Sequence, residues 1–207
     1  MMNRRQFVYA AASAAMLARA SNVLAATYDV IVKGGRVIDP SLRINAIRDV
    51  AIAGGRIAAV EANIAADAEE TIDARGRLVV PGLLDIHTHY ARDNEGPTVC
   101  LADGVTGWID AGSQGADHIA DSVAVAKSAP QQGRVLINIG RAGILPGGDT
   151  MDISRADVGA AKDAIARNRD FIVGVKARLS RDVAADDVEV LGRAQEVATS
   201  FNLPVMI

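Results

Sequence analysis

Short apolar runs alternate with amphipathic helical patterns along the second half of the chain, and this alternation constrains the fold more than any other feature. Runs of this length, rich in branched aliphatic residues, are typical of buried strands. Strands that alternate with helices form βαβ units, which predicts a parallel sheet. Counting the run that precedes His87, the sequence predicts five strands, of which the later ones lie at residues 104–110, 134–139, 171–176 and 203–207.

Helices are expected between these strands, each with one apolar face. Ser154 and Asp157 resemble a capping box at the start of the second helix. The residues expected on the apolar faces are Ile119, Val123 and Ala126 in the first helix, Val158, Ala161 and Ile165 in the second, and Val188, Leu191, Ala194 and Ala198 in the third.

The predicted fold class is α/β, with an incomplete (β/α)8 TIM barrel of about five strands at residues 79–207. A complete barrel takes about 250 residues, whereas about 180 of the 207 residues follow residue 26. The chain also stops at Ile207, inside an apolar run, although domains normally end in exposed polar segments. We therefore expect an N-terminal fragment of a longer protein. A doubly wound open sheet is the competing fold, but it would open with a strand, a Gly-rich turn and a helix.

A small β module is expected at residues 27–78, before the barrel. It contains short β-rich runs interrupted by glycines, and Gly34-Gly35 and Gly54-Gly55 are expected to form hairpin turns. A third unit of this kind surrounds Gly76. No helical pattern follows these glycines, so they are interpreted as turn residues and not as phosphate-binding loops.

Residues 1–26 have the pattern of a twin-arginine export signal. Paired arginines precede a mostly apolar run at residues 8–17, and small residues lead to a peptidase site at Ala25 or Ala26. The run is too short for a permanent membrane span. We therefore expect recognition by the twin-arginine export machinery and a periplasmic or secreted product. An ordinary Ala-rich amphipathic helix is the alternative interpretation.

Charge and cysteine content exclude several classes of protein. The formal net charge is −3, with acidic and basic residues interspersed, so no nucleic-acid partner is expected. Cys100 is the single cysteine, which excludes an internal disulfide and a zinc site built from cysteines. We expect Cys100 to be a small buried hydrophobic residue.

His87 and His89 form a His-x-His pair at the end of the first barrel strand. Side chains alternate along a strand, so these two imidazoles point to the same side. Two neutral imidazoles in this arrangement can converge on one metal ion. A polar pair that happens to end a strand is the alternative interpretation.

Lys176 lies near the end of the fourth strand, inside an apolar run. Burial lowers the pKa of a lysine, and the neutral amine can react with CO2 to give a carbamate. The two oxygens of a carbamate can bridge two metal ions. The alternative is a lysine whose ammonium group reaches solvent at the strand end.

Several segments together carry a family resemblance, and they are residues 34–40 (GGRVIDP), 49–52 (DVAI), 80–89 (VPGLLDIHTH), 110–113 (DAGS) and 174–180 (GVKARLS). With these segments the chain resembles the amidohydrolase superfamily of metal-dependent hydrolases, and the last two are similar to its deacetylase-type, dihydroorotase-like branch. The resemblance implies a small β-sandwich beside the barrel. It also implies that His87 and His89 bind the more buried of two divalent metal ions, expected to be zinc, and that a Lys176 carbamate bridges both.

Members of this family also use two histidines from the fifth and sixth strands, and an aspartate from the eighth strand that manages the proton of the metal-activated water. Residues 1–207 contain none of these, so no catalytic residue is assigned in the chain. His118 is expected at a helix start, in a surface or capping role. We expect the fragment alone to bind metal weakly and to hydrolyse little or nothing.

The resemblance implies deacetylase-like hydrolysis of an amide or ester bond in a small-molecule substrate, at a binuclear metal site. A cyclic-amide hydrolase, dihydroorotase-like or hydantoinase-like, is one alternative. Dihydroorotases usually carry an arginine where this chain has Ala91, although Arg92 comes next. Mononuclear deaminases lack the bridging lysine, so Lys176 counts against them. The other alternative is a non-catalytic half-barrel that serves as an interaction surface.

Overall fold

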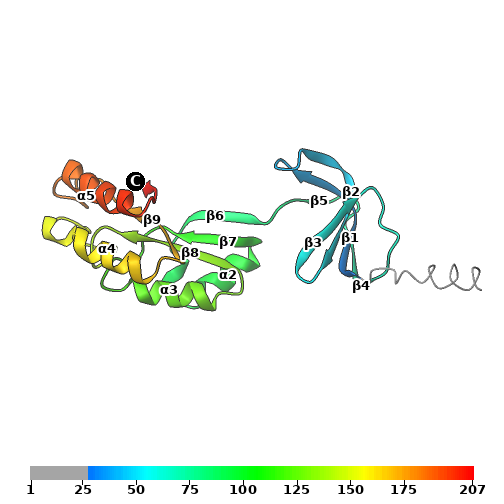
Figure 1. Ribbon diagram of the computed structural model, residues 1–207, viewed down its shortest axis with the longest axis horizontal. Helices are drawn as coiled ribbons and strands as arrows, with labels where there is room; N and C mark the ends of the chain where they lie inside the picture. Colours follow the sequence, from blue (N-terminus) through cyan, green and yellow to red (C-terminus); the bar gives the residue numbers. More distant parts are fainter. Residues whose placement is uncertain (1–27) are drawn as a thin grey trace, which may run out of the picture. The chain divides into compact units, whose positions relative to one another are not determined.

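A computed structural model describes residues 28–207, and the expected export signal at residues 1–26 lies outside this described part. The chain divides into two compact units, one ending at Pro81 and one running from Gly82 to Ile207. Figure 1 shows the first unit as strands in blue to cyan, and the second as strands and helices in green to red.

The first unit contains the strands β1 (Tyr28–Asp39), β2 (Ile44–Ala53), β3 (Arg56–Glu61), β4 (Ala68–Asp73) and β5 (Leu78–Val79). They form one sheet in the order β3-β2-β1-β4, and β5 also pairs with β1 (Figure 1). β2 is antiparallel to both β1 and β3, whereas β4 and β5 run parallel to β1. The expected β module is therefore present, and its described residues form a single sheet.

The Gly34-Gly35 pair lies inside β1 at a bulge, so the hairpin turn expected there is wrong. Gly34 has a φ of +68°, and a Cβ on Gly35 would collide with the side chain of Val79. The bulge forms because β4 and β5 run one after the other along β1, and the segment that joins them packs against the glycine pair. The strands on either side of Gly76 are therefore not a hairpin. Gly54-Gly55 does form the expected turn, between β2 and β3.

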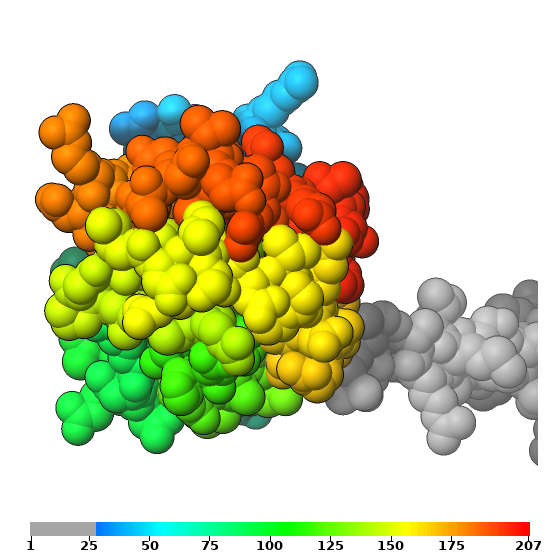
Figure 2. All heavy atoms as spheres, turned by 90° about the vertical axis from the view of Figure 1, so that its left-hand side faces the viewer, coloured from blue at the N-terminus to red at the C-terminus, as the bar shows by residue number. Residues whose placement is uncertain are grey.

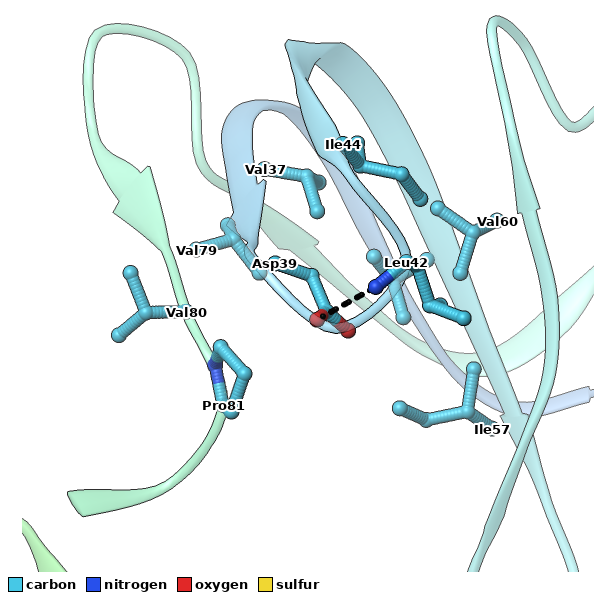
Figure 3. Close-up of a pocket in the computed structure, with 10 residues that line it drawn as sticks. Val37, Asp39, Leu42, Ile44, Ile57, Val60, Val79, Val80 and Pro81 are labelled. Atoms are coloured by element: carbon cyan, nitrogen blue, oxygen red, sulfur yellow. Dashed lines mark hydrogen bonds between the residues drawn. The ribbon is translucent and has the colours of Figure 1, made fainter.

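An apolar pocket of about 380 Å³ opens on this sheet beside the turn that joins β1 to β2 (Figure 3). Asp39 closes that turn, because its carboxylate accepts the backbone N–H groups of Ser41 and Leu42 at 2.8 and 3.2 Å. Apart from this carboxylate, which is used in the turn, the pocket is lined by aliphatic side chains and a proline. It therefore presents an apolar surface and no set of converging catalytic groups. Besides Asp39, its lining residues are Val37, Leu42, Ile44, Val50, Ile57, Val60, Val79, Val80 and Pro81.

The second unit contains the strands β6 (Leu83–Thr88), β7 (Val105–Asp110), β8 (Gln132–Asn138), β9 (Ile172–Lys176) and β10 (Val205–Met206). They form a parallel sheet in the order β10-β9-β8-β7-β6 (Figure 1). Strands that follow one another in the sequence are thus neighbours in the sheet, as consecutive strands of a (β/α)8 barrel are. This order confirms the predicted five-stranded part of a barrel.

The helices of the second unit are α2 (Gly96–Ala102), α3 (Ile119–Ser128), α4 (Val158–Arg167) and α5 (Asp187–Ser200), with the short 3-10 helices η1 (Tyr90–Arg92) and η2 (Ile153–Arg155). α2 packs against β7, α3 against β8 and α5 against β9. In Figure 2, α5 (orange to red) lies beside α4 (yellow). The sequence pattern did not predict α2, because a helix of 7 residues has no clear apolar period. No helix among residues 28–207 is long and apolar enough to cross a membrane.

A hydrophobic core lies between the parallel sheet and its helices. Cys100 is fully buried in it, which confirms the expected small hydrophobic role. The largest fully buried side chains of this core are those of Trp108, Ile137, Ile139, Ile165 and Ile172. Burial of such side chains is the main favourable contribution to the stability of this unit.

Two details of the helices differ from the sequence prediction. Val188, which the periodicity places on the buried face of α5, is 82% exposed, and the helix packs through Val190, Ala194 and Val197. These three residues follow the i, i+4, i+7 spacing of one helical face, and Val188 lies off that face. At α4, Asp157 alone is the N-cap and accepts the backbone N–H of Ala160 at 2.9 Å, whereas Ser154 lies in η2.

Candidate metal centre

Buried polar side chains end neighbouring strands of the parallel sheet. Thr88, Asp110, Asn138 and Lys176 are the last residues of β6, β7, β8 and β9, and each is at most 5% exposed. The strand register places Thr88 beside Asp110 and Asn138 beside Lys176. Burying polar groups costs free energy unless they find partners, and the carboxyl edge of a parallel barrel sheet carries the functional residues. This edge is therefore the candidate functional site.

The two histidines lie at this edge. His87 belongs to β6, and His89 is the first residue after this strand. Both residues are exposed. Their ring centroids are 5.9 Å apart, with the ring planes at 77°. Metal–nitrogen bonds to imidazole are about 2.0–2.1 Å long, so two rings at this separation can share one ion. The structure therefore brings the two imidazoles together, and their metal-binding role stays a prediction.

His89 is held by a chain of hydrogen bonds that the sequence did not reveal. Its Nδ1 lies 2.8 Å from Oγ of Ser113, and that hydroxyl donates to Oδ2 of Asp110 at 2.8 Å. Asp110 also accepts the backbone N–H groups of Ser113 at 2.7 Å and of Ala91 at 3.1 Å. The sequence signal that could have found these residues is an aspartate that ends a buried strand, followed by a serine in the next turn.

The electrostatic environment of His89 favours the neutral form of its ring. Desolvation by the surrounding protein lowers the pKa of His89, and the charge of Asp110 partly opposes this by raising that pKa. Arg92, His87 and Lys176 lower the pKa further. Neutral imidazole is the form that coordinates metal ions. Arg92 therefore lies within electrostatic reach of the site, whereas Ala91 is buried and contributes its backbone.

Lys176 is 5% exposed, so its amine is largely removed from bulk water. Burial lowers the pKa of Lys176, Arg178 lowers it further, and Asp149 raises it. The carboxylate of Asp149 is already bound by Nη1 of Arg178 at 3.1 Å and Nδ2 of Asn138 at 2.9 Å. None of the ion pairs found among residues 28–207 includes Lys176. These surroundings favour the neutral amine that carbamate formation requires.

The turn after β7 connects the two parts of the site. Gly112 has a φ of +78°, and a Cβ at this position would collide with the Cβ of Lys176. The carbonyl oxygen of Gly112 accepts a hydrogen bond from Nδ2 of Asn138 at 3.2 Å. Ser113, the next residue, contacts His89. A single turn thus lies against Lys176 on one side and His89 on the other, and only glycine fits at its centre.

His118 has the expected surface position. It occupies the N-cap position of α3 without a capping side-chain hydrogen bond, and its Nδ1 lies 3.9 Å from Asp121. The capping alternative is therefore wrong. In the described part of the chain, no group of three or more His, Cys, Asp or Glu side chains is placed to hold a metal ion. The proposed ligand set is of another kind, because its third member is a lysine.

Comparison with known proteins identifies relatives of about twice this length. No protein-family model matches the chain. A deacetylase of Enterococcus faecalis is 34% identical over 191 residues, which cover 87% of this chain and 50% of the deacetylase. The chain thus spans about half the length of this curated relative.

Solved structures share the fold over 86% of this chain. A dihydroorotase, 25% identical, has a TM-score of 0.75, and an adenine deaminase, 30% identical, has a TM-score of 0.71, with 50% of each of those chains covered. An N-acyl-D-glutamate deacylase from Bordetella bronchiseptica, complexed with zinc and a phosphonate inhibitor, is 19% identical with a TM-score of 0.65 and 44% of it covered. At that identity the likeness is one of fold alone.

Proposed function

The chain belongs to the amidohydrolase superfamily, and from this premise we propose that it builds part of the active site of a metal-dependent hydrolase. The proposed reaction is deacetylase-like cleavage of an amide or ester bond in a small-molecule substrate. The observation that carries the proposal is the buried Lys176 at the same sheet edge as the paired rings of His87 and His89. A buried lysine whose pKa is lowered costs stability, so its presence at this edge calls for a functional reason.

The proposed ligands are His87, His89 and a carbamate on Lys176. The neutral Lys176 amine adds to CO2 and releases one proton, which leaves an anion with two oxygens. The imidazoles would bind one divalent ion, and the carbamate oxygens would bridge it to a second. Zinc is proposed because it accepts both imidazole nitrogen and carboxylate-type oxygen ligands, and because the Bordetella deacylase of the same fold is complexed with zinc.

When bound, the metal ions would supply Lewis acidity and lower the pKa of water at the site. The residues of this chain provide the setting for that chemistry. Asp110 and Ser113 hold the ring of His89 in place, and Asn138 and Asp149 fix the neighbouring turns. The contacts made by Asp110, Asn138 and Asp149 are buried, and the one between Ser113 and His89 is partly buried. The site is therefore largely preorganised for a charge that develops there.

Metal analysis of the purified full-length protein tests the ligand set. We expect the parent protein to bind divalent metal and Lys176→Ala to lose the bridged ion. The matched control is Lys162→Ala on α4, which removes a lysine that pairs with Glu196 at 2.8 Å and should keep the metal content of the parent. A carbamate carbon signal from 13C-bicarbonate should appear in the parent and vanish in Lys176→Ala. Unchanged metal content in Lys176→Ala would refute the bridging role.

Substrate assays separate the candidate reactions. For the full-length protein, acetate release from N-acetyl or O-acetyl compounds, abolished by Lys176→Ala, is the expected result, whereas residues 1–207 alone should release little or none. The likeness to a dihydroorotase, with a TM-score of 0.75, favours cyclic-amide hydrolysis as the second candidate. Turnover of dihydroorotate alone would assign the site to that candidate, and turnover of adenine alone would contradict both. A full-length protein that binds no metal and turns over none of these compounds would favour a non-catalytic interaction role.

We also propose that the protein is exported by the twin-arginine route to the periplasm or outside the cell. The support is the paired arginines, apolar run and small residues within positions 1–26. Mass spectrometry of the exported protein should find a new N-terminus after Ala25 or Ala26. An exported protein that still begins at Met1 would contradict this proposal.

A further inference from the structure

We propose that Ser113 and Asp110 are positioning residues that hold the ring proton of His89 on Nδ1, so that Nε2 presents a lone pair to a metal ion. The inference rests on the proposed function and deepens it. It assigns a role to the Asp-Ala-Gly-Ser turn at residues 110–113, which supplies none of the proposed ligands.

Both carboxylate oxygens of Asp110 accept hydrogen bonds. It accepts Oγ–H and N–H of Ser113 at 2.8 and 2.7 Å, and N–H of Ala91 at 3.1 Å. It is 1% exposed, so these contacts take the place of water. An ionised carboxylate has no proton and can only accept hydrogen bonds. Any hydroxyl that contacts Asp110 must therefore be the donor.

This requirement decides the direction of the next hydrogen bond. A serine hydroxyl has one proton, and in Ser113 that proton points to Asp110. The oxygen then meets Nδ1 of His89 at 2.8 Å with a lone pair. The imidazole must donate in this contact, so Nδ1 carries the proton. A neutral imidazole has one ring proton, which leaves Nε2 as the metal-binding nitrogen.

The turn that holds Ser113 is fixed on several sides. The backbone N–H of Ala111 donates to the carbonyl of Thr88 at 2.8 Å, and the N–H of Asn138 donates to the carbonyl of Gln114 at 2.9 Å. Ser113 itself is 3% exposed. The hydroxyl therefore cannot easily rotate to solvent, and water cannot easily replace it. A metal-binding histidine is usually oriented in this way by a hydrogen bond that the N–H of its other nitrogen donates.

The neighbouring histidine provides an internal contrast. The backbone N–H of His87 donates to Asp85 at 3.0 Å, but none of the hydrogen bonds found among residues 28–207 involves the His87 ring. The Ser113–Asp110 pair thus acts on one histidine of the two. Only the tautomer of His89 should depend on this pair.

Nuclear magnetic resonance of the metal-free chain tests the proposal directly. The chain has 3 histidines, so 15N-histidine labelling gives few ring signals, which His87→Gln and His118→Gln assign. At about pH 8, where ordinary imidazole is neutral, long-range 1H–15N spectra should show His89 protonated on Nδ1. In Ser113→Ala nothing specifies the proton, and His89 should give a mixture of both tautomers.

Ser122→Ala is the matched control, because Ser122 is also a buried serine with one hydroxyl hydrogen bond, to the carbonyl of Ala91 at 3.1 Å. It should leave the His89 tautomer unchanged. Zinc affinity, measured by chelator competition, should fall about 10- to 100-fold in Ser113→Ala and stay constant in Ser122→Ala.

A parent chain with His89 protonated on Nε2 would overturn the proposal, and so would a Ser113→Ala spectrum identical to that of the parent. The parent measurement decides the question even if Ser113→Ala does not fold. A parent chain protonated on Nδ1 that binds no zinc would support the hydrogen-bond assignment and contradict the proposed function. The two failures are therefore distinguishable.

Discussion

Replacing Gly112 with alanine should destabilise the second unit more than the same replacement at Gly104. Both glycines have positive φ, +78° at Gly112 and +85° at Gly104. A residue with a Cβ in this region costs about 1–2 kcal/mol, and both variants carry that cost. At Gly112 the new Cβ also collides with the side chain of Lys176, whereas at Gly104 it meets nothing within 4 Å.

An added methyl group in a packed site costs about 1–3 kcal/mol. The expected loss of unfolding free energy is therefore about 2–5 kcal/mol for Gly112→Ala and about 1–2 kcal/mol for Gly104→Ala. Urea unfolding followed by tryptophan fluorescence measures both, because Trp108 is the single tryptophan and is fully buried in this unit. Equal losses in the two variants would refute the close contact between the turn and Lys176.

Further predictions concern the charged residues of each unit. Lys176→Met should stabilise the chain at neutral pH in CO2-free buffer, because burial lowers the pKa of Lys176 from its ordinary value of 10.5 and penalises the protonated amine only when folded. In the unfolded chain the lysine keeps its proton up to about pH 10.5. The stability of the parent should therefore rise with pH between the lowered pKa of the folded state and that value, and the advantage of Lys176→Met should shrink over the same range. An advantage that does not change with pH in urea titrations would contradict this prediction. Asp49→Ala should destabilise the first unit by about 2–4 kcal/mol, because Asp49 is 4% exposed, pairs with Lys33 at 2.8 Å and accepts two backbone N–H groups. Thermal unfolding followed by circular dichroism measures that loss. The control is Asp73→Ala, which removes an exposed carboxylate and should change stability little. Similar losses in the two variants would show that the buried contacts of Asp49 do not stabilise the first unit.

The strands of the second unit could be predicted from the sequence because buried parallel strands are continuous apolar runs. The helices α3, α4 and α5 were found by their apolar faces, although Val188 was wrongly placed on one of them. The Gly34-Gly35 pair shows where local pattern is insufficient. A glycine pair allows both a hairpin turn and a bulge, and only the pairing of β1 with β4 and β5 selects the bulge.

The sequence by itself determined the candidate ligands, because His87 and His89 are two residues apart on a strand and Lys176 ends an apolar run. The tertiary structure alone decided what surrounds them. Ser113 is 24 residues from His89 in the chain, and the two meet because the carboxyl ends of β6 and β7 are adjacent in the sheet. The lowered pKa of Lys176 likewise depends on burial and on the charges of Arg178 and Asp149. Such long-range contacts follow from strand order and register, which bring together residues that no local pattern relates.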